Sequence, residues 1–425
     1  MTNQFASTAK VARSMNELWR HRGILAAATT GMGLSIATMP PFVLSVFAGP
    51  MTRELGWTLQ VFQTANLFTS LGILAAAPLG GLLLDRFGVR RVALTGIITY
   101  GVALAAFSQV SASAWTFYAI MLLVTLLSGG TLSITWTRLI NANFVSRRGT
   151  ALGIALSGSG LAATFLPALS YTLIVKLGWR SAWIALASLP LLIAWPMVWR
   201  FVAGKDAGKD TGKTATSTEQ IRGAVPLAGV NVRTALRMRQ VWVLAGSLAL
   251  MSFCLGGWTA NLVPILMTKG LDAGAAAKLA GVLGLSLIFG RIGSGMLLDR
   301  FRAPAIAVLV FMLPAVGFNL LRIEQPTLLA LGFAVALCGV AAGAEYDFLG
   351  YLVGRYFGLA HYGKIFGLII LPITVATSSG AVVVGRILDQ HGSFMAALPA
   401  LTILVTIGAL LPLALGRRSN SGAAS

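Results

Sequence analysis

The sequence predicts an all-α membrane protein with twelve transmembrane helices in two six-helix bundles related by an internal repeat. Three observations lead to this prediction. Of the 425 residues, 56% are apolar and only 10% are charged, whereas a soluble domain carries about 25% charged residues. Apolar runs long enough to cross a bilayer recur along the whole chain, and the two halves match at one fixed offset. The composition therefore excludes a soluble globular protein.

The expected spans follow from the apolar windows, because a transmembrane helix needs about 20 mostly apolar residues. In the first half these windows cover 24–48, 59–84, 92–109, 115–140, 150–175 and 181–201. In the second half they cover 240–267, 277–298, 304–322, 327–353, 364–387 and 395–416. We expect the first run to stay as helix 1 rather than be cleaved as a signal peptide, because further spans follow it.

A polar segment in the middle of the chain separates the two sets of spans. Residues 202–239 contain the run GKDAGKDTGKTATSTEQ, a composition that cannot bury a core and is typical of a flexible linker. The predicted regions are a cytoplasmic N-terminal segment (1–23), an N-terminal six-helix bundle (24–201), a cytoplasmic linker (202–239), a C-terminal six-helix bundle (240–416) and a cytoplasmic tail (417–425).

The charges predict the orientation. There are 32 basic and 12 acidic residues, and most of the basic ones lie at the two ends, in the linker and after the even-numbered spans. The positive-inside rule places these segments in the cytoplasm. We therefore expect a multi-pass protein of a bacterial-type inner (plasma) membrane with both termini cytoplasmic. The lipid bilayer is the expected partner of its surface, and nucleic acid is not.

No pattern of metal-ligating or catalytic residues stands out. Cys254 and Cys338 lie in apolar runs without a partner, and His21, His361 and His391 lie near a terminus or in loops. Neither set has the spacing of a metal site or of a nucleophile with its base. We expect no metal, no cofactor and no enzyme activity.

The internal repeat has an offset of 214 residues. At this offset the segment Gly81–Phe87 (GLLLDRF) matches Gly295–Phe301 (GMLLDRF). Chance matches of apolar residues are common in such a chain, but an Asp-Arg pair in unchanged register is not. Prolines and glycines match at the same offset: Pro50 with Pro264, Gly56 with Gly270, Gly149 with Gly363, Gly153 with Gly367, and Gly178 with Gly392. A duplicated six-helix unit predicts a central site between two halves.

The clearest motif is GGLLLDRFGVRR at 80–91, with a partial copy, GSGMLLDRFR, at 293–302. Gly81 and Asp85 share a helix face, so another helix can approach while the carboxylate meets an arginine or a helix N-terminus at the membrane boundary. Arg138, near the cytoplasmic end of helix 4, is a candidate partner for Asp85. The alternative is that these are plain boundary charges.

This motif resembles the loop between helices 2 and 3 of the major facilitator superfamily, G-x3-D-R-x-G-x-R/K-R/K. The resemblance implies the major facilitator fold and a conformational latch. The second copy is degraded, since Arg302 stands where a glycine is expected. The latch residues implied are Gly81, Asp85, Arg86, Gly88, Arg90, Arg91, Arg138, Asp299 and Arg300.

Two further segments are similar to the monocarboxylate porter and oxalate/formate exchanger branch of that superfamily. They are NFVSRRGTALGIALSGSG at 143–160 and RYFGLAHYGKIFGLI at 355–369. The resemblance implies a monomeric secondary transporter that moves a small monocarboxylate or related organic anion by alternating access, with protons. The GxxxG pairs in both segments, which include Gly153 and Gly367, are expected to allow close helix packing.

Arg291 is the main candidate for binding the substrate carboxylate. It lies eight residues before Asp299, too deep in the predicted helix for easy snorkelling. In the resembling branch, helix 8 carries an arginine at this distance, and that arginine binds the substrate carboxylate. A guanidinium matches a carboxylate with two hydrogen bonds. The alternative is a structural ion pair with Glu345 or Asp347.

Other polar residues inside the spans are weaker candidates. Glu345 and Asp347 are two apart, so at most one is expected to point into a cavity. Glu345 is the deeper candidate for carrying a proton, although both acids could instead brace a nearby arginine or the start of helix 11. Candidates for lining the substrate cavity are Asn261, Trp258, Tyr118 and Asn66, each of which could equally be packed between helices.

The chain departs from that branch in three places. Helix 1 carries no charge between Gly23 and Met51, Leu287 stands one turn before Arg291 where an acid would be expected, and Lys364 lies at the start of helix 11 rather than at mid-depth. The paired basic groups for a dicarboxylate are therefore missing, which favours a substrate with one carboxylate. Rival readings are efflux of hydrophobic drugs and a non-transporting membrane sensor on the same scaffold.

Overall fold

The computed structural model describes residues 17–144, 148–202, 230–358 and 361–415, and its regular elements in these ranges are helices without a β-strand. The chain divides into two compact units. Unit 1 comprises Met1–Trp57 and Phe68–Ala224, and unit 2 comprises Thr58–Leu67 and Val225–Ser425. The predicted helical membrane fold is confirmed. Residues 58–67, expected in the N-terminal bundle, pack with unit 2.

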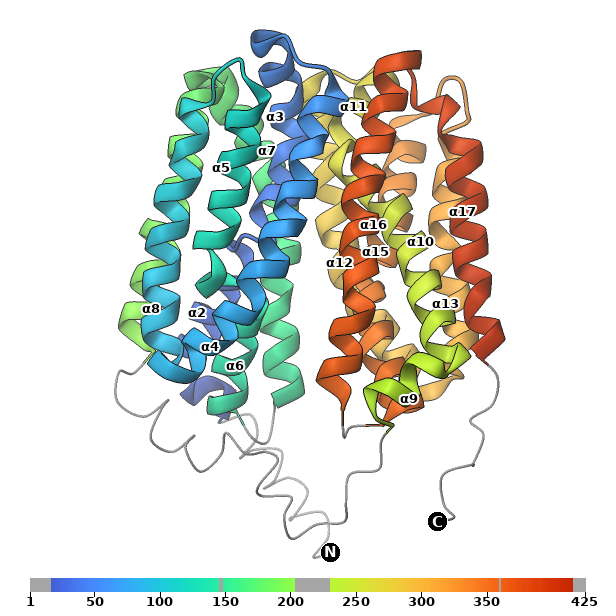
Figure 1. Ribbon diagram of the computed structural model, residues 1–425. Coiled ribbons are helices and arrows are strands. Elements are labelled where there is room, and N and C mark those ends of the chain that lie inside the picture. The colour runs from blue at the N-terminus through green and yellow to red at the C-terminus, as the bar shows by residue number, and fades with distance from the viewer. Residues whose placement is uncertain (1–16, 145–147, 203–229, 359–360, 416–425) are drawn as a thin grey trace, which may run out of the picture. The chain divides into compact units, whose positions relative to one another are not determined.

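Unit 1 is a helical bundle (Figure 1). Its core surrounds the indole of Trp136, which donates to the carbonyl of Thr131 at 2.9 Å. Its elements are α2 (Arg22–Gly33), α3 (Met39–Leu55), the larger part of α4 (Leu59–Ala105), η1 (Ala106–Gln109), α5 (Ala114–Leu127), η2 (Gly129–Thr131), α6 (Ser133–Asn143), α7 (Arg148–Leu189), the π-helical η3 (Pro190–Ala194) and α8 (Trp195–Phe201).

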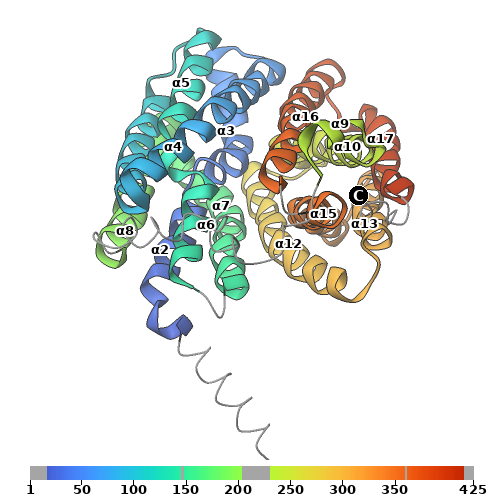
Figure 2. The same cartoon turned by 60° about the horizontal axis from the view of Figure 1, so that its bottom comes forward.

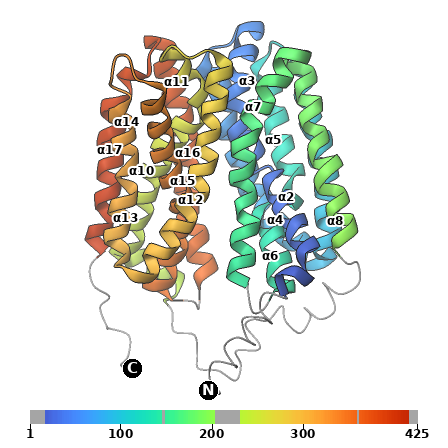
Figure 3. The same cartoon turned by 180° about the vertical axis from the view of Figure 1, so that it is seen from behind.

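Unit 2 is also a helical bundle, in which α15 packs against α10, α12, α13, α14 and α16. Figure 2 shows α15 enclosed by several of these helices, and Figure 3 shows the same bundle from behind. Its elements are α9 (Val232–Arg237), α10 (Arg239–Ala260), α11 (Leu262–Thr268), α12 (Ala273–Arg300), α13 (Ala303–Phe311), α14 (Leu313–Leu320), α15 (Leu328–Phe357), α16 (Tyr362–His391), η4 (Phe394–Ala396), α17 (Leu398–Leu410) and η5 (Leu411–Leu415).

By length and composition, nine helices of the described ranges are able to span a membrane, and each difference from the expected twelve spans has a local cause. The first expected span is broken between Gly33 and Met39, and the fourth is broken at η2, so their pieces are shorter than a full span. The fifth and sixth spans run on as one helical stretch, Thr150–Phe201.

Two glycines change the chain direction inside continuous helical runs. Gly88 in α4 has φ 76° and ψ 163°, and Gly178 in α7 has φ 77° and ψ 160°. This region of backbone conformation is essentially restricted to glycine. Each glycine therefore lets one span end and the next begin without a loop.

Close helix packing in unit 2 relies on glycines of α12 and α15. A Cβ added at Gly290 would lie 2.1 Å from the carbonyl oxygen of Val340, and one added at Gly343 would lie 2.2 Å from that of Leu287. The close packing expected at Gly153 and Gly367 is not found within the described ranges, where no atom lies within 4 Å of an added Cβ. The expectation is therefore not met at these two positions, and the surroundings of Gly149 and Gly363, the other members of the two pairs, lie outside the described part of the structure.

Candidate functional site

Arg291 lies two-thirds of the way along α12, on a helix that approaches α15 closely at Gly290. Its guanidinium interacts electrostatically with the Asp347 carboxylate and with Tyr346, both on α15. Ser294, one turn further on, places its hydroxyl 3.4 Å from Oδ2 of Asp347 and 3.1 Å from the carbonyl oxygen of Arg291. The structure therefore brings the predicted cation together with one of the two predicted acids.

Glu345 points to a different neighbour. Its side chain is buried, with 6% of its surface exposed, and Oε1 accepts a hydrogen bond from the hydroxyl of Ser252 on α10. Cys254, which is fully buried, lies close enough to interact electrostatically with Glu345. The two acids of α15 thus contact different partners, as their spacing predicts. Glu345 is an acid enclosed in the bundle beside a hydroxyl group.

Asn261 and Asn66 belong to one hydrogen-bond network in unit 2. The amide of Asn261 donates to the carbonyl oxygens of Gly257 (2.9 Å) and Ala381 (3.1 Å). Its Oδ1 accepts from Nε2 of Gln63 at 3.0 Å, and Oε1 of Gln63 accepts from Nδ2 of Asn66 at 2.8 Å. Both Gln63 and Asn261 are fully buried. This arrangement links α4, α10 and α16.

Trp258, the third candidate from the second half, is fully buried in the aromatic core of unit 2. Its ring lies 5.9 Å from that of Phe318 and 5.7 Å from that of Phe394. The indole nitrogen has no hydrogen-bond partner among the described residues. Packing between helices accounts for this position, and a role in lining a cavity stays a prediction.

Tyr118 lies in unit 1, on α5, within a cluster of aromatic rings. It stacks on Phe68 with 4.8 Å between ring centroids and meets Trp115 edge-on at 5.7 Å. Trp115 is 71% exposed, so this cluster reaches the surface of unit 1. Its contribution to a substrate site is likewise a prediction.

The motif at 80–91 forms the ion pair that the sequence suggested, between Asp85 and Arg138. Nη1 of Arg138 lies 2.5 Å from Oδ1 of Asp85, and the two side chains are 29% and 69% exposed. Arg90 donates to the carbonyl oxygen of Trp199 at 3.0 Å, which fixes the start of the third span to the end of α8. Both interactions lie within unit 1, around the turn at Gly88.

The remaining latch candidates make fewer contacts. Arg86 and Arg91 are exposed, and Arg86 lies over the ring of Phe87. Among the described residues, no atom lies within 4 Å of a Cβ added at Gly81. Arg300 is exposed at the end of α12, and the side chain of Asp299 lies outside the described part. Their role in a latch stays a prediction.

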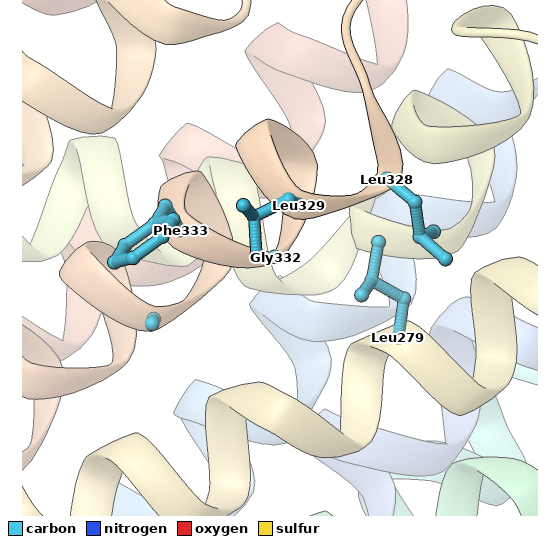
Figure 4. A pocket seen from close by; sticks show the side chains of 6 residues that line it. Leu279, Leu328, Leu329, Gly332 and Phe333 are labelled. Carbon is cyan, nitrogen blue, oxygen red and sulfur yellow. The ribbon is translucent and has the colours of Figure 1, made fainter.

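A groove of about 580 Å³ opens on the outer surface of unit 2 between α12 and α15 (Figure 4). Its lining is apolar throughout: Leu279, Leu328, Leu329, Gly332, Phe333 and Ala336. Leu279 precedes Arg291 by twelve residues, about 18 Å of helix. The groove holds no group that could recognise an anion, and its exposed leucines suit a surface that faces lipid.

Sequence reasoning missed three polar residues that organise these contacts. Gln63, Ser252 and Ser294 each stand in an apolar run and look unremarkable in the sequence. Gln63 is three residues before Asn66, so the spacing alone could have placed both amides on one helix face. The partners of the two serines lie on distant parts of the chain, and no local pattern indicates them.

The chain matches the model of the Major Facilitator Superfamily over residues 23–371. It is 26% identical over 367 residues to monocarboxylate transporter 13 of Bos taurus, covering 83% of this chain and 78% of that protein. It is 24% identical over 361 residues to monocarboxylate transporter 11 of Mus musculus, covering 81% and 76%. It is 24% identical over 293 residues to the 3-(3-hydroxy-phenyl)propionate transporter of Escherichia coli, covering 67% and 68%.

These matches agree with the helical membrane fold described above. The family match covers most of the chain, including both copies of the Asp-Arg motif at 80–91 and 293–302. The protein is a multi-pass membrane transporter of the major facilitator superfamily.

Proposed function

We propose that this protein moves a small monocarboxylate or related organic anion across a membrane by alternating access, coupled to protons. The observation that carries the proposal is Arg291, a cation held inside α12 next to the Asp347 carboxylate. A charged side chain at the bilayer centre costs about 2.5–3.5 kcal/mol on insertion scales. Such a charge is retained where function needs it.

Arg291 suits recognition of a carboxylate. Its guanidinium offers five N–H donors in a planar fork, and two of them match the oxygens of one carboxylate. A substrate carboxylate takes the place of Asp347 as partner of this cation, so the guanidinium is never left without an anion. The relatives named for monocarboxylates and for 3-(3-hydroxy-phenyl)propionate favour substrates of this class. Asn261, Asn66, Trp258 and Tyr118 are weaker candidates for contacts to the rest of the substrate.

Glu345 is the proposed proton carrier, with Asp347 as the second candidate. The Glu345 carboxyl is enclosed, and its described hydrogen-bond partner is the uncharged hydroxyl of Ser252. A carboxyl in such surroundings can alternate between a protonated form and an ionised form that the hydroxyl stabilises. We place the protein, as a monomer, in a bacterial-type inner membrane with both termini in the cytoplasm. The Asp85–Arg138 pair acts as the latch on that side.

The test is uptake of radiolabelled carboxylates into proteoliposomes that contain the purified protein, under an imposed pH gradient. We expect uptake of monocarboxylates and not of dicarboxylates. Arg291→Lys should weaken binding at least about tenfold, since a point charge cannot reproduce the fork. Arg302→Lys, at the exposed membrane boundary, is the matched control. Wild-type affinity in Arg291→Lys would contradict the role of Arg291, and transport of hydrophobic dyes without carboxylates would support drug efflux instead.

Coupling is tested separately with Glu345→Gln, which keeps the shape and hydrogen-bonding capacity of the side chain but does not titrate. Accumulation driven by the pH gradient should disappear, while exchange of substrate at equal pH continues. Glu324→Gln, in the exposed loop before α15, is the control for loss of an acid elsewhere. If Glu345→Gln still accumulates substrate when the pH gradient is the sole driving force, Glu345 is structural and the proton route lies elsewhere.

A further inference from the structure

The helices α12 and α15 of unit 2 pack closely in their middle parts and separate toward their first residues. A Cβ added at Gly339 would lie 2.7 Å from the carbonyl oxygen of Leu283. At Gly332, two turns nearer the start of α15, the nearest atom to an added Cβ is Cδ1 of Leu279, at 3.7 Å. The apolar groove described above, here called the α12–α15 groove, lies where the two helices diverge.

The groove runs along the helices from the membrane boundary inward. Leu328 is the first residue of α15, and Ala336 lies eight residues further on, about 12 Å of helix. The loop before α15 carries the exposed polar residues Glu324 and Gln325. Figure 4 shows Leu279 and Leu328 on facing sides of the groove. Since one leaflet of the hydrocarbon core is about 15 Å deep, the groove covers most of the depth of one leaflet.

The helices of the groove can be compared with their counterparts in unit 1 residue by residue. The helices α4 and α5 start at Leu59 and Ala114, and α12 and α15 start at Ala273 and Leu328. Both pairs of starting residues are separated by the repeat offset of 214. The residues equivalent to the groove lining therefore lie on α4 and α5.

Aromatic rings occupy the equivalent position in unit 1. Tyr118 stands in place of Gly332, and its ring stacks on that of Phe68 with 4.8 Å between the centroids. Trp115 meets the ring of Tyr118 edge-on at 5.7 Å. In unit 2 the residue equivalent to Phe68 is Val282, so the stacked pair has no counterpart there. Unit 1 thus packs this space with its own side chains, whereas unit 2 leaves it open.

Lys278 lies at the mouth of the groove. It precedes Leu279 in the chain and is exposed, and it interacts electrostatically with Asp272, the N-cap residue of α12. A lysine near the end of a membrane helix extends its ammonium group to the interface, where lipid phosphates lie. The equivalent residue in unit 1 is the uncharged Thr64. An apolar groove with a cation at its mouth matches the two parts of an anionic phospholipid.

We propose that the α12–α15 groove binds one anionic phospholipid, with an acyl chain along the groove and the phosphate near Lys278. The groove volume of about 580 Å³ falls within the range of about 300–1,000 Å³ that is typical of ligand pockets. The acyl chain occupies the space that Tyr118 and Phe68 fill in unit 1. This site requires that the chain lies in a membrane, and it depends neither on the proposed substrate nor on proton coupling.

The experiment uses the full-length protein in phosphatidylcholine vesicles that contain a small fraction of phosphatidylglycerol with a diazirine on one acyl chain. After irradiation, mass spectrometry compares lipid adducts on residues 328–336 with adducts on the equivalent residues 114–122 of unit 1. A bound lipid should give at least about tenfold more adducts on 328–336, and these should saturate as the probe fraction rises. Equal adduct levels that rise in proportion to the probe on both segments would overturn the site, because bulk lipid behaves in this way.

Two variants test the groove and its mouth separately. Gly332→Tyr combined with Val282→Phe gives unit 2 the aromatic filling of unit 1, and adducts on 328–336 should fall to the level on 114–122. Lys278→Gln, a change at an exposed position, should lower the adducts about fivefold, the effect of one lysine on an anionic headgroup. The matched control is Lys176→Gln, at an exposed lysine of unit 1, which should leave them unchanged.

Three results would contradict the proposal. Adducts that persist in the folded, filled variant would overturn the acyl-chain site, and adducts that are unchanged in Lys278→Gln would overturn its preference for an anionic lipid. Cross-links between two copies of the chain through residues 328–336, in place of lipid adducts, would assign the groove to an oligomer contact. Failure of carboxylate uptake would overturn the proposed function and leave the adduct levels unaffected.

Discussion

The two copies of the repeat differ most in what their spans contain. Unit 2 carries Arg291, Glu345 and Asp347 inside α12 and α15, whereas the equivalent positions in unit 1 are Ala77, Thr131 and Ser133. The two copies share a glycine where the backbone conformation favours one, because Gly56 and Gly270 have positive φ values of 70° and 88°. The comparison indicates that the two copies share the backbone scaffold, whereas the charged side chains at these positions belong to one copy alone.

The largest expected difference between the copies concerns helix packing at Gly343 and its equivalent, Gly129. A Cβ at Gly343 would lie 2.2 Å from the carbonyl oxygen of Leu287, while one at Gly129 would lie 3.5 Å from that of Ala76. Gly343→Ala should therefore destabilise the protein by about 3 kcal/mol, because backbone must move. Gly129→Ala should change stability by less than about 0.5 kcal/mol. Thermal unfolding in detergent measures both, and equal midpoints would contradict the asymmetry.

The second prediction concerns the turn after the Asp-Arg pair. Gly88 has φ 76°, while its counterpart, Arg302, has φ −70°, which any residue adopts. Gly88→Ala should cost about 2 kcal/mol of backbone strain, and Arg302→Ala should have little effect on stability. The same unfolding assay tests this, and a Gly88→Ala protein as stable as the parent would show that the turn relaxes.

A smaller effect on stability is expected for the Asp85–Arg138 pair. In unit 2 the position equivalent to Arg138 is the buried Leu352, so the pair has no counterpart there. Both side chains reach solvent, so a double-mutant cycle with Asp85→Ala and Arg138→Ala should give a coupling of about 0.2–1 kcal/mol. Asp85→Asn should nonetheless shift the balance between transport states while leaving substrate affinity nearly intact, if the pair is a latch. If labelling of engineered cysteines on the side opposite the latch is the same in Asp85→Asn as in the parent protein, Asp85 is a boundary charge and not part of a latch.

The smallest effect is a pH dependence confined to unit 1. The Glu54 carboxylate accepts from the indole of Trp179 at 2.5 Å and from Arg180, and these two interactions lower its pKa below the ordinary 4.5. Because the pKa of Glu54 is lower in the folded state than in the unfolded state, its carboxylate stabilises the folded state at pH values above the ordinary pKa. This contribution is lost as the pH falls through the lowered pKa of the folded state. The equivalent of Glu54 in unit 2 is Thr268.

The measurement compares thermal unfolding of the parent and Glu54→Gln between pH 7 and pH 3. The parent should be more stable at neutral pH, and the difference should shrink as the carboxylate is protonated. A difference that stays constant over this range would mean that Glu54 does not contribute through its charge.

The sequence allowed the fold class, the repeat and the Asp85–Arg138 pair to be predicted, because apolar windows and motif spacing are local signals. It also allowed the separation of Glu345 from Asp347 to be predicted from helix geometry alone. The breaks in the first and fourth spans were not predicted, since Ser35 and Gly130 act through buried contacts. An added Cβ at Gly130, for example, would lie 2.2 Å from the carbonyl oxygen of Val92.

The polar contacts of the site were the least predictable part. Ser252 contacts Glu345 across 93 positions of the chain, and Asp389 contacts Leu59 across 330. Contacts between residues so far apart in the sequence produce no periodic pattern from which they could be predicted. Asp389 carries one indirect sign, an acid near the C-terminus of an apolar helix, where its charge is unfavourable for that helix.

The split membership of α4 also bears on how the chain is made. During synthesis, residues 58–67 leave the ribosome long before their partners. Asn261, the partner of Gln63, is made 198 residues later, and Asp389, the partner of Leu59, is made 330 residues later. The first turns of α4 are therefore made together with unit 1, before their neighbours in unit 2 have been synthesised. These turns reach their final packing only after the second half of the chain has been made. A chain cut within the linker should regain these neighbours only when both pieces are made together in the same membrane.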